Sequence, residues 1–332
     1  MMFIISLLKS KFSVNIPKFS HNNLKKIRTG LFYCYRCTMS NKTEDIIEKT
    51  KQLAPRLTND KHKGQAGRIG VFGGSIEFTG APYFASISSL KVGADLVYLF
   101  TNKEPATVIK SYSPELMVLP ILNDPEAIKK IEPWLERLHV VVIGPGLGRN
   151  DQTFEVITKV IETCRQKQKP LVIDADGLFL IAQRHDLIKN YPAPVVLTPN
   201  VMEFNRLVGD TPGDGSKQEK AAAFLMEVGS NVTLLCKDHE DEIISRGTTV
   251  KVSGGGSGRR CGGQGDILAG SLSTFLAWSI MADYAPNVAC YAACRMVRDL
   301  NSKAFVKYGR SMTATDMIPE IHEVFEENFE RK

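Results

Sequence analysis

A glycine-rich run of thirteen residues, Gly254–Asp266, is the segment of the sequence best suited to chemistry. Seven of these residues are glycine, Arg259 and Arg260 stand among them, and an apolar stretch typical of a helix follows at once. The start of a helix presents free backbone N–H groups and the positive end of its dipole, and glycine lets an anion approach the backbone closely. The segment therefore predicts a phosphate-binding loop, with the two arginines as additional cationic contacts.

Asp266 closes this run. A carboxylate beside a bound phosphate is electrostatically costly unless the protein uses it, for example as the base that takes a proton from an attacking hydroxyl. The alternative is a plain helix N-cap in an ordinary glycine-rich loop. The abundance of glycine and arginine favours the first interpretation, in which Asp266 is a catalytic base.

Oxygen-bearing side chains follow two predicted strands. Asn200 and Glu203 are three residues apart where a strand passes into a helical turn, so an amide oxygen and a carboxylate share one face. Such hard ligands suit a hydrated Mg²⁺ attached to phosphates, although N-x-x-E is also a common helix start. Asp174 and Asp176 end another strand, where either carboxylate could reach the metal or simply form a turn.

Glycines mark the ends of two further strands. Gly144, Gly146 and Gly148 would let a ligand lie against the backbone, but their spacing G-x-G-x-G differs from the dinucleotide fingerprint G-x-G-x-x-G. A tight turn from strand to helix is an equally good interpretation. Gly70–Ser75 is expected to wall a substrate pocket, and the upstream segment Lys61–Arg68 is expected to be a mobile basic flap.

These residues must be positioned by an alternation of short apolar runs and helical patterns. Continuous apolar runs are typical of parallel strands covered on both faces, and the alternation predicts a doubly wound α/β sheet. The expected strands are Ile69–Phe72, Asp95–Thr101, Leu116–Ile121, Val140–Ile143, Leu171–Ile173, Val195–Thr198 and Val232–Cys236, followed by a hairpin of Glu242–Arg246 and Thr248–Val252. The expected helices are Ala81–Val92, Pro125–Leu138, Asp151–Gln166, Leu178–Leu187, Lys217–Val228, Asp266–Met281, Asn287–Lys307 and Asp316–Glu327, the last with an N-cap at Thr315-Asp316.

The net charge of +6 is divided unevenly along the chain. Residues 1–42 hold eight Lys and Arg and no acid, and removing these eight from the total of 42 leaves 34 basic against 36 acidic residues. An acid-free basic leader is typical of a mitochondrial transit peptide, so we expect a leader over 1–43, import of the full-length form into the matrix, and a single catalytic domain over 51–332. Met39 offers a second start for a cytosolic form. The slightly acidic body argues against nucleic-acid binding, and we expect no membrane span.

Several motifs occur in this sequence in the same order as in one known family of proteins. Asn200-x-x-Glu203 followed by Gly263-x-Gly265-Asp266 resembles the ribokinase superfamily, which implies a ribokinase-like three-layer α/β fold with a mostly parallel sheet. Longer strings narrow the resemblance to the eukaryotic ATP-dependent (S)-NAD(P)H-hydrate dehydratases: Lys63-Gly-Gln-Ala-Gly-Arg, Phe78-Thr-Gly-Ala-Pro, Gly144-Pro-Gly-Leu-Gly-Arg, Val172-Ile-Asp-Ala-Asp-Gly, Leu197-Thr-Pro-Asn and Arg259-Arg-Cys-Gly-Gly-Gln-Gly-Asp. The resemblance runs from about Lys51 to the C-terminus.

The resemblance implies a lyase that repairs the hydrated cofactors NADHX and NADPHX. Such an enzyme uses ATP with Mg²⁺ to phosphorylate the hydroxyl at C6 of the nicotinamide ring in the S hydrate, and loss of phosphate restores NADH or NADPH. It also implies a separate NAD(P)H-hydrate epimerase for the R form, while a homo-oligomer stays an open alternative. The rival interpretations are a ribokinase-type vitamin or nucleoside kinase and an inactive nucleotide-binding regulatory protein.

The resemblance also carries site residues over to this sequence. Asp266 is implied as the catalytic base, in contact with the hydrate. The implied hydrate contacts are Gly148, Asn200, Val201, Met202, Glu203, Phe204, Asn205 and Arg206, of which Asn200 and Glu203 also orient Mg²⁺ indirectly. The implied ATP contacts are Lys237, Asp238, His239, Glu240, Asp241, Gly256, Ser257, Gly258, Arg259, Arg260, Cys261, Gly262, Gly263, Gln264 and Gly265. Asp238 stands where many relatives have a glycine.

Overall fold

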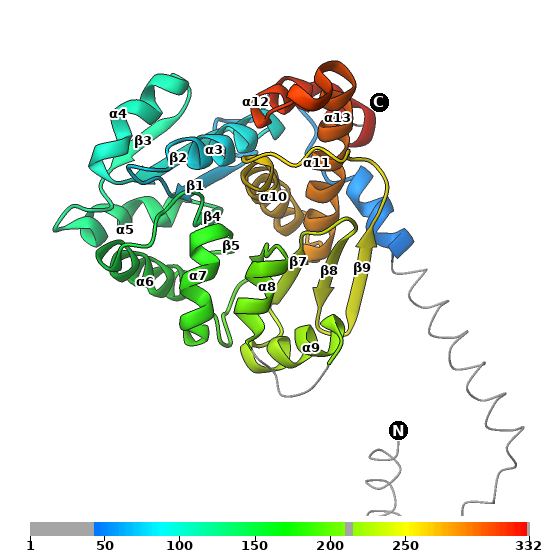
Figure 1. The fold of residues 1–332 in the computed structure, drawn as a ribbon. Helices are drawn as coiled ribbons and strands as arrows, with labels where there is room; N and C mark the ends of the chain where they lie inside the picture. Colours follow the sequence, from blue (N-terminus) through cyan, green and yellow to red (C-terminus); the bar gives the residue numbers. More distant parts are fainter. Residues whose placement is uncertain (1–42, 210–214, 331–332) are drawn as a thin grey trace, which may run out of the picture. The chain divides into compact units, whose positions relative to one another are not determined.

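In the computed structural model, which describes residues 43–209 and 215–330, the chain is organised around one nine-stranded sheet (Figure 1). The strands lie in the order β3-β2-β1-β4-β5-β6-β7-β8-β9. Strands β1 to β7 are parallel, and β8 and β9 add an antiparallel hairpin at one edge. Their bounds are β1 Arg68–Phe72, β2 Leu96–Thr101, β3 Met117–Pro120, β4 Val140–Ile143, β5 Leu171–Ile173, β6 Val195–Leu197, β7 Val232–Cys236, β8 Asp241–Ser245 and β9 Thr248–Val252.

The predicted strands and the late hairpin are all present, with bounds within two residues of those expected. In β4, Val140 and Val142 belong to the hydrophobic core on one face of the sheet, whereas Val141 and Ile143 belong to the core on the other face. Because both faces are buried, successive side chains must all be apolar. The unbroken apolar runs of the sequence therefore identified parallel strands correctly.

Helices cover both faces of the sheet and complete three layers (Figure 1). The core on one face includes residues of α3 (Gly80–Val92), α4 (Lys103–Tyr112), α10 (Gln264–Met281), α11 (Pro286–Tyr308), α12 (Ala314–Met317) and α13 (Ile321–Asn328). The core on the other face includes residues of α5 (Ala127–Arg137), α6 (Asp151–Gln166), α7 (Ala175–Gln183), α8 (Val201–Val208) and α9 (Lys217–Val228). This is the three-layer α/β arrangement that the sequence predicted.

Several helical segments differ from expectation. Helix α8 was expected only as a helical turn after β6, and the helix expected over Leu178–Leu187 is α7, which ends at Gln183, and a 3₁₀ turn at His185–Leu187. Helix α4 was not predicted, because it is short and its β-branched run Thr107–Ile109 has low helix propensity. The single helix expected over Asp316–Glu327 is instead α12, a 3₁₀ turn at Ile318–Glu320 and α13. Its N-cap is Thr313, whose N–H donates to the Asp316 carboxylate at 2.8 Å, so the predicted cap at Thr315-Asp316 is wrong.

The segment expected to be a basic flap lies away from the carboxyl ends of the strands. The N–H groups of Gly64 and Ala66 donate to the carboxylate of Asp95 at 2.7 and 2.9 Å, and Arg68 begins β1. The segment is therefore tied to the amino ends of β1 and β2. Ligands of open α/β sheets bind at the opposite edge, so the prediction of a flap over the site is wrong.

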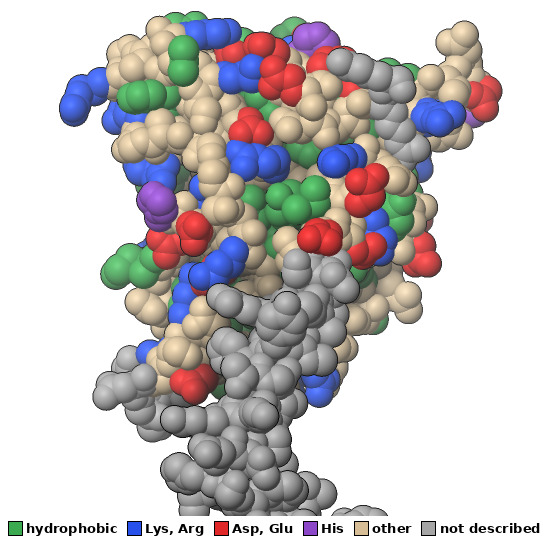
Figure 2. Space-filling model, turned by 90° about the vertical axis from the view of Figure 1, so that its right-hand side faces the viewer, with side chains coloured by type: hydrophobic (Ala, Val, Ile, Leu, Met, Phe, Trp, Pro, Cys, Tyr) green, Lys and Arg blue, Asp and Glu red, His purple; other side chains and the backbone are tan. Residues whose placement is uncertain are grey.

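The compact unit that holds these elements comprises Ile46–Lys332. The leader predicted over 1–43 and the second start at Met39 lie outside the described residues, apart from position 43. None of the described helices combines the length and apolar character that crossing a membrane requires. On the face drawn in Figure 2, basic and acidic side chains are interspersed, which fits the near-neutral charge of the body.

Candidate active site

The residues selected for their chemistry converge at the carboxyl ends of the parallel strands. Ser75 follows β1, Gly148 follows β4, Asp174 follows β5, Asn200 follows β6 and Lys237 follows β7. The first turn of α10, which carries Asp266, lies against this row, since a Cβ at Gly265 would lie 3.4 Å from Lys237 Nζ and 3.9 Å from Asp174 Oδ2. Parallel topology thus gathers segments that are up to 190 residues apart in the sequence at one edge of the sheet.

A buried ion pair lies at the centre of the site. Lys237 Nζ donates to Asp174 Oδ1 at 2.7 Å, and the hydroxyl of Thr198 donates to the same oxygen at 2.7 Å. The side chain of Asp174 is only 3% exposed, and Glu203 Oε2 lies 3.8 Å from the Lys237 ammonium. Burial alone would lower the pKa of Lys237, but the two carboxylates outweigh it and the net shift is upward. Lys237 therefore stays cationic in the site.

Helix α10 begins at Gln264, and its first turn lies beside this ion pair. Its N-cap is Gly263 in the left-handed region at φ 93°, so Asp266 lies within the first turn and is not the N-cap. A Cβ at Gly263 would lie 2.5 Å from that of Ala314, and a Cβ at Gly265 would lie 3.4 Å from Lys237 Nζ. Glycine at these positions lets the helix start approach the ammonium closely. The free N–H groups of the first turn make this start a site for an anion.

Asp266 has the protonation behaviour of a base for neutral pH. Burial, together with the negative charges of Asp174 and Glu203, raises the pKa of Asp266 to about 7, although Lys237 opposes the shift. A carboxyl group with this pKa is ionised in a large fraction of molecules at neutral pH and binds a proton readily. This supports the prediction that Asp266 acts as a base.

A large cavity of about 950 Å³ opens on one side of Asp266. Its lining comes from the loops and helix starts that follow β1 to β5, and from the first turn of α10: Ser75, Ile76, Glu77, Phe78, Ala81, Asn102, Glu104, Asn123, Gly146, Leu147, Gly148, Arg149, Asn150, Gln152, Thr153, Ala175, Asp176 and Asp266. The Gly148 N–H and Arg149 Nε each donate to the Asp176 carboxylate at 3.0 Å, which fixes the glycine loop. Gly148 and Asp266 thus share one cavity, and Ser75 walls it as expected.

A second cavity, of about 490 Å³, opens on the other side of the start of α10. Nine of the residues predicted to contact ATP line it: Lys237, Asp238, His239, Asp241, Gly256, Arg260, Cys261, Gln264 and Gly265. Arg259 instead donates from Nε to the carbonyl of Met312 at 3.1 Å and fastens the loop. Of the two arginines expected beside a phosphate, Arg260 is the one that lines the cavity.

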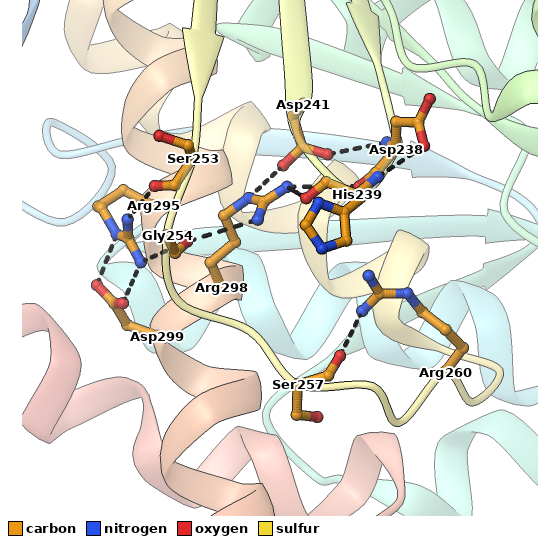
Figure 3. A network of polar contacts seen from close by, with 10 residues as sticks. All are labelled: Asp238, His239, Asp241, Ser253, Gly254, Ser257, Arg260, Arg295, Arg298 and Asp299. Atoms are coloured by element: carbon orange, nitrogen blue, oxygen red, sulfur yellow. Dashed lines mark hydrogen bonds and ion pairs between the residues drawn. The ribbon is translucent and has the colours of Figure 1, made fainter.

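An arginine that the sequence did not single out organises the second cavity (Figure 3). Arg298 on α11 donates to the Asp241 carboxylate at 2.8 Å and to the His239 carbonyl at 2.7 Å. Arg295, one turn earlier, donates to the Ser253 carbonyl at 3.0 Å and pairs with Asp299. Together the two arginines hold the turn after β7 and the loop after β9 against one helix. Nothing in the local sequence around Arg298 indicates this role, because the partners of its side chain lie more than 40 residues away.

The segment Asn200–Arg206 lies on the side of the second cavity. Asn200 lines it, and with Val201, Phe204, Asn205 and Lys237 it also lines a small cavity of about 210 Å³. Asn200 and Glu203 form a reciprocal capping box at the start of α8, with N–H to oxygen distances of 2.8 and 2.9 Å. The structure therefore places Asn200 beside Lys237 and separates it from Gly148.

The two residues of this capping box, Asn200 and Glu203, are also those predicted to orient Mg²⁺ indirectly. No group of three or more His, Cys, Asp or Glu side chains that could hold a metal ion occurs among residues 43–209 and 215–330. The described residues thus offer single carboxylates, such as Glu203, and no all-protein cage.

The arrangement as a whole suits transfer of a phosphoryl group. Asp266 borders the large cavity, whereas Gln264, Gly265 and Lys237 border the second cavity. A hydroxyl in the large cavity would face the base. A polyphosphate in the second cavity would meet the N–H groups of α10 and the ammonium.

The comparisons with known proteins all indicate the same family. A family model described as NAD(P)H-hydrate dehydratase matches residues 69–323. An ATP-dependent (S)-NAD(P)H-hydrate dehydratase of Aedes aegypti is 51% identical over 300 residues, which cover 89% of this chain and 88% of that protein. The enzyme of the same name from Bos taurus is 47% identical over 297 residues, covering 86% and 90%.

Solved structures agree on the fold. A ribokinase-like superfamily protein of Enterococcus faecalis superposes with a TM-score of 0.70 at 24% identity, covering 86% of this chain and 95% of that one. An ADP/ATP-dependent NAD(P)H-hydrate dehydratase of Bacillus subtilis, co-crystallised with ATP and Mg²⁺, superposes with a TM-score of 0.61 at 19% identity, covering 84% and 97%. With a matching family model over most of its length and relatives near 50% identity, this chain belongs to the NAD(P)H-hydrate dehydratase family.

Proposed function

We propose that this protein is an ATP-dependent dehydratase of the S form of hydrated NADH and NADPH. The observation that carries the proposal is the position of Asp266, which borders the large cavity while the two preceding residues, Gln264 and Gly265, border the second cavity. The hydrate binds in the large cavity, and ATP binds in the second cavity. The names of the relatives describe the same reaction.

The reaction begins with proton transfer. Asp266 takes the proton of the C6 hydroxyl, and the oxygen attacks the γ-phosphorus of ATP, so that the bond to the β-phosphate oxygen breaks and ADP forms. The C6–O bond then breaks with loss of phosphate, the proton at C5 leaves, and the ring double bond is restored. ATP and the hydrate become ADP, phosphate and NADH or NADPH. The phosphoryl transfer is needed because hydroxide is a poor leaving group and phosphate a good one.

The surrounding residues stabilise charge during this transfer. The N–H groups of Gln264 and Gly265 and the Lys237 ammonium face the phosphates, where they neutralise the developing negative charge. Asp174 holds the ammonium in place through its 2.7 Å contact. Asn200 and Glu203 would contact the water shell of Mg²⁺ on the phosphates, and the metal would supply further charge neutralisation there.

The proposed activity is tested with purified protein, ATP, Mg²⁺ and NADHX. We expect the absorbance of the reduced nicotinamide to return with release of ADP and free phosphate. Asp266→Asn should bind ATP normally and lower kcat by roughly a thousandfold or more, whereas the exposed Asp151→Asn should be unchanged. A stable phosphorylated product would identify a kinase, and unchanged turnover in Asp266→Asn would remove this residue from the mechanism.

The cellular context of the enzyme follows from the leader and the substrate. We infer import of the full-length form into the mitochondrial matrix, a cytosolic form that begins at Met39, and a separate epimerase that supplies the S hydrate. The eight basic residues and the absence of acid over 1–42 support import. A reporter fused to residues 1–38 should enter mitochondria, and a purely cytosolic reporter would refute this inference.

A further inference from the structure

The proposed reaction requires a second base after the phosphoryl transfer. Asp266 takes the proton of the C6 hydroxyl, so its carboxyl group is protonated when the second step begins. The C6–O bond of the phosphorylated hydrate then breaks with the help of the electron pair on the ring nitrogen, which leaves a cation with a double bond between nitrogen and C6. This cation becomes NADH only when a base removes a proton from C5. If water adds to C6 first, the hydrate forms again and ATP is consumed without repair.

The carboxylates that line the large cavity differ in their distance from the start of α10. The first turn of this helix, with Asp266, lies beside the end of β5. Asp176 follows β5, whereas Glu77 follows β1 and Glu104 follows β2, two and three intervals away in the strand order. At the usual strand spacing these intervals are about 10 and 14 Å. Asp176 is therefore the carboxylate best placed beside a ring that contacts Asp266.

Asp176 is held firmly at the wall of this cavity. Its carboxylate accepts hydrogen bonds from the Gly148 N–H and from Arg149 Nε, both at 3.0 Å, and the Arg149 guanidinium lies 4.2 Å from the centre of the Phe179 ring. The side chain of Asp176 is 16% exposed and lines the cavity. Because a carboxylate has about four positions for hydrogen bonds, these two bonds leave part of it available to a substrate.

The backbone next to Asp176 is strained. Ala175 has φ 47°, in the left-handed region that a residue with a side chain rarely adopts. It separates Asp174, which pairs with the buried Lys237, from Asp176, which lines the large cavity. Strain of this kind persists where the surrounding structure enforces it, and it is concentrated at active sites. The turn thus provides two acids with different tasks, one at the ammonium and one at the large cavity.

We propose that Asp176 is a second catalytic base, which removes the C5 proton after phosphate has left. The electron pair of the C5–H bond forms the C5–C6 double bond, the electron pair of the C6–N double bond returns to nitrogen, and the proton passes to the Asp176 carboxylate. A proton on the carbon next to such a cation is acidic, so an ordinary carboxylate suffices. The inference rests on the proposed function, because it assigns one step of the same reaction.

The test measures how much NADH is formed for each ADP released from (S)-NADHX, after subtraction of the ADP released without hydrate. Wild type should give a ratio near one. Asp176→Asn keeps an oxygen that accepts a hydrogen bond but is a far weaker base. It should release ADP within about threefold of the wild-type rate, while the ratio falls by about tenfold or more. The missing product should appear as free phosphate and as hydrate of both epimers, since water adds to either face of the cation.

Three further variants separate proton transfer from structure. Asp176→Glu retains a carboxylate and should keep the ratio above about one half. Arg149→Gln removes the ion pair but leaves the Asp176 carboxylate, so its ratio should stay near one. Asp151→Asn, an exposed change on α6, should match wild type.

Three outcomes would overturn the proposal: a ratio near one in Asp176→Asn, an equal loss of ADP and NADH formation in that variant, or an equal fall of the ratio in Arg149→Gln. The last two would show that Asp176 only holds the loop after β4. The proposed function fails in a different way. Wild-type protein would then form no NADH from the hydrate, or it would release a stable phosphorylated product.

Discussion

At the scale of single residues, the protonation of Asp266 decides when the site can work. Burial raises the pKa of Asp266 to about 7, and the base is active only when ionised. We therefore expect kcat/KM to rise about tenfold per pH unit below about pH 7 and to level off above it. The measurement is a pH–rate profile at saturating ATP. A profile that levels off near the ordinary aspartate pKa of about 4 would show that another group limits the reaction.

The raised pKa of Asp266 also has a cost in stability. Because the folded state binds this proton more tightly than the unfolded state, the contribution of Asp266 to the free energy of unfolding falls as pH rises from about 4 to about 7. Asp266→Asn carries no charge there, so it should be more stable than wild type at pH 8, by about 1–3 kcal/mol. The gain should vanish near pH 4. Urea unfolding at both pH values measures it, and equal stability at pH 8 would contradict the burial of the charge.

At the scale of elements, the loop after β4 depends on one glycine. Gly144 has φ 123°, and a Cβ there would lie 1.8 Å from the carbonyl oxygen of Asp174. Gly247, in the hairpin between β8 and β9, has φ 76° but no atom near its Cβ position. Both Gly→Ala variants pay for the backbone conformation, about 1 kcal/mol, but only Gly144→Ala adds a clash.

We expect Gly144→Ala to lower the free energy of unfolding by about 3 kcal/mol or more and to reduce turnover, because Asp174 must move. Gly247→Ala should lose only about 1 kcal/mol and keep full activity. Denaturant unfolding of the two variants side by side checks this. Similar losses in both would mean that conformational strain alone, and not the close approach to β5, explains the glycine.

Arg298 on α11 clamps the turn after β7 through its bonds to Asp241 and the His239 carbonyl, and this clamp leads to a further prediction at this scale. Arg298→Lys keeps the positive charge but loses the fork of donors that reaches Asp241 and the His239 carbonyl together. The turn after β7 should loosen, and KM for ATP should rise roughly fivefold to tenfold with a smaller change in kcat. Arg246→Lys is the control, since Arg246 is exposed in the turn between β8 and β9 and lines neither cavity. The same KM in both variants would show that the clamp does not shape the nucleotide site.

The elements differ in how far sequence could predict them. Strands buried on both faces, such as Val140–Ile143, have an unbroken apolar pattern and were predicted with their bounds. Helix α4 contains the β-branched run Thr107–Ile109, whose low helix propensity hid the helix from a sequence-based prediction. Pro319 divides the last helix because proline lacks an N–H, although the apolar pattern continues past it.

At the scale of the whole molecule, some residues of the site could also be predicted from the sequence and others could not. Asp266 and the glycines around it could be predicted because one contiguous segment carries their signal. The clamp by Arg298 could not be predicted, nor could the contact between Glu104 and Asn123 in the large cavity. In both cases the partners lie on different elements and come together only in the fold. The basic charge of the chain, in turn, says little about its ligands, since 1–42 holds the excess.

The start of α10 borders two separate cavities, and this has a consequence for the order of events during turnover. Neither ligand has to pass through the other's cavity to enter or to leave. Both must be present together before the phosphoryl group moves, and no protein side chain needs to carry it in between. Initial-rate plots at several fixed ATP concentrations should therefore give intersecting lines, the sign of a ternary complex, in contrast to the parallel lines of a ping-pong enzyme.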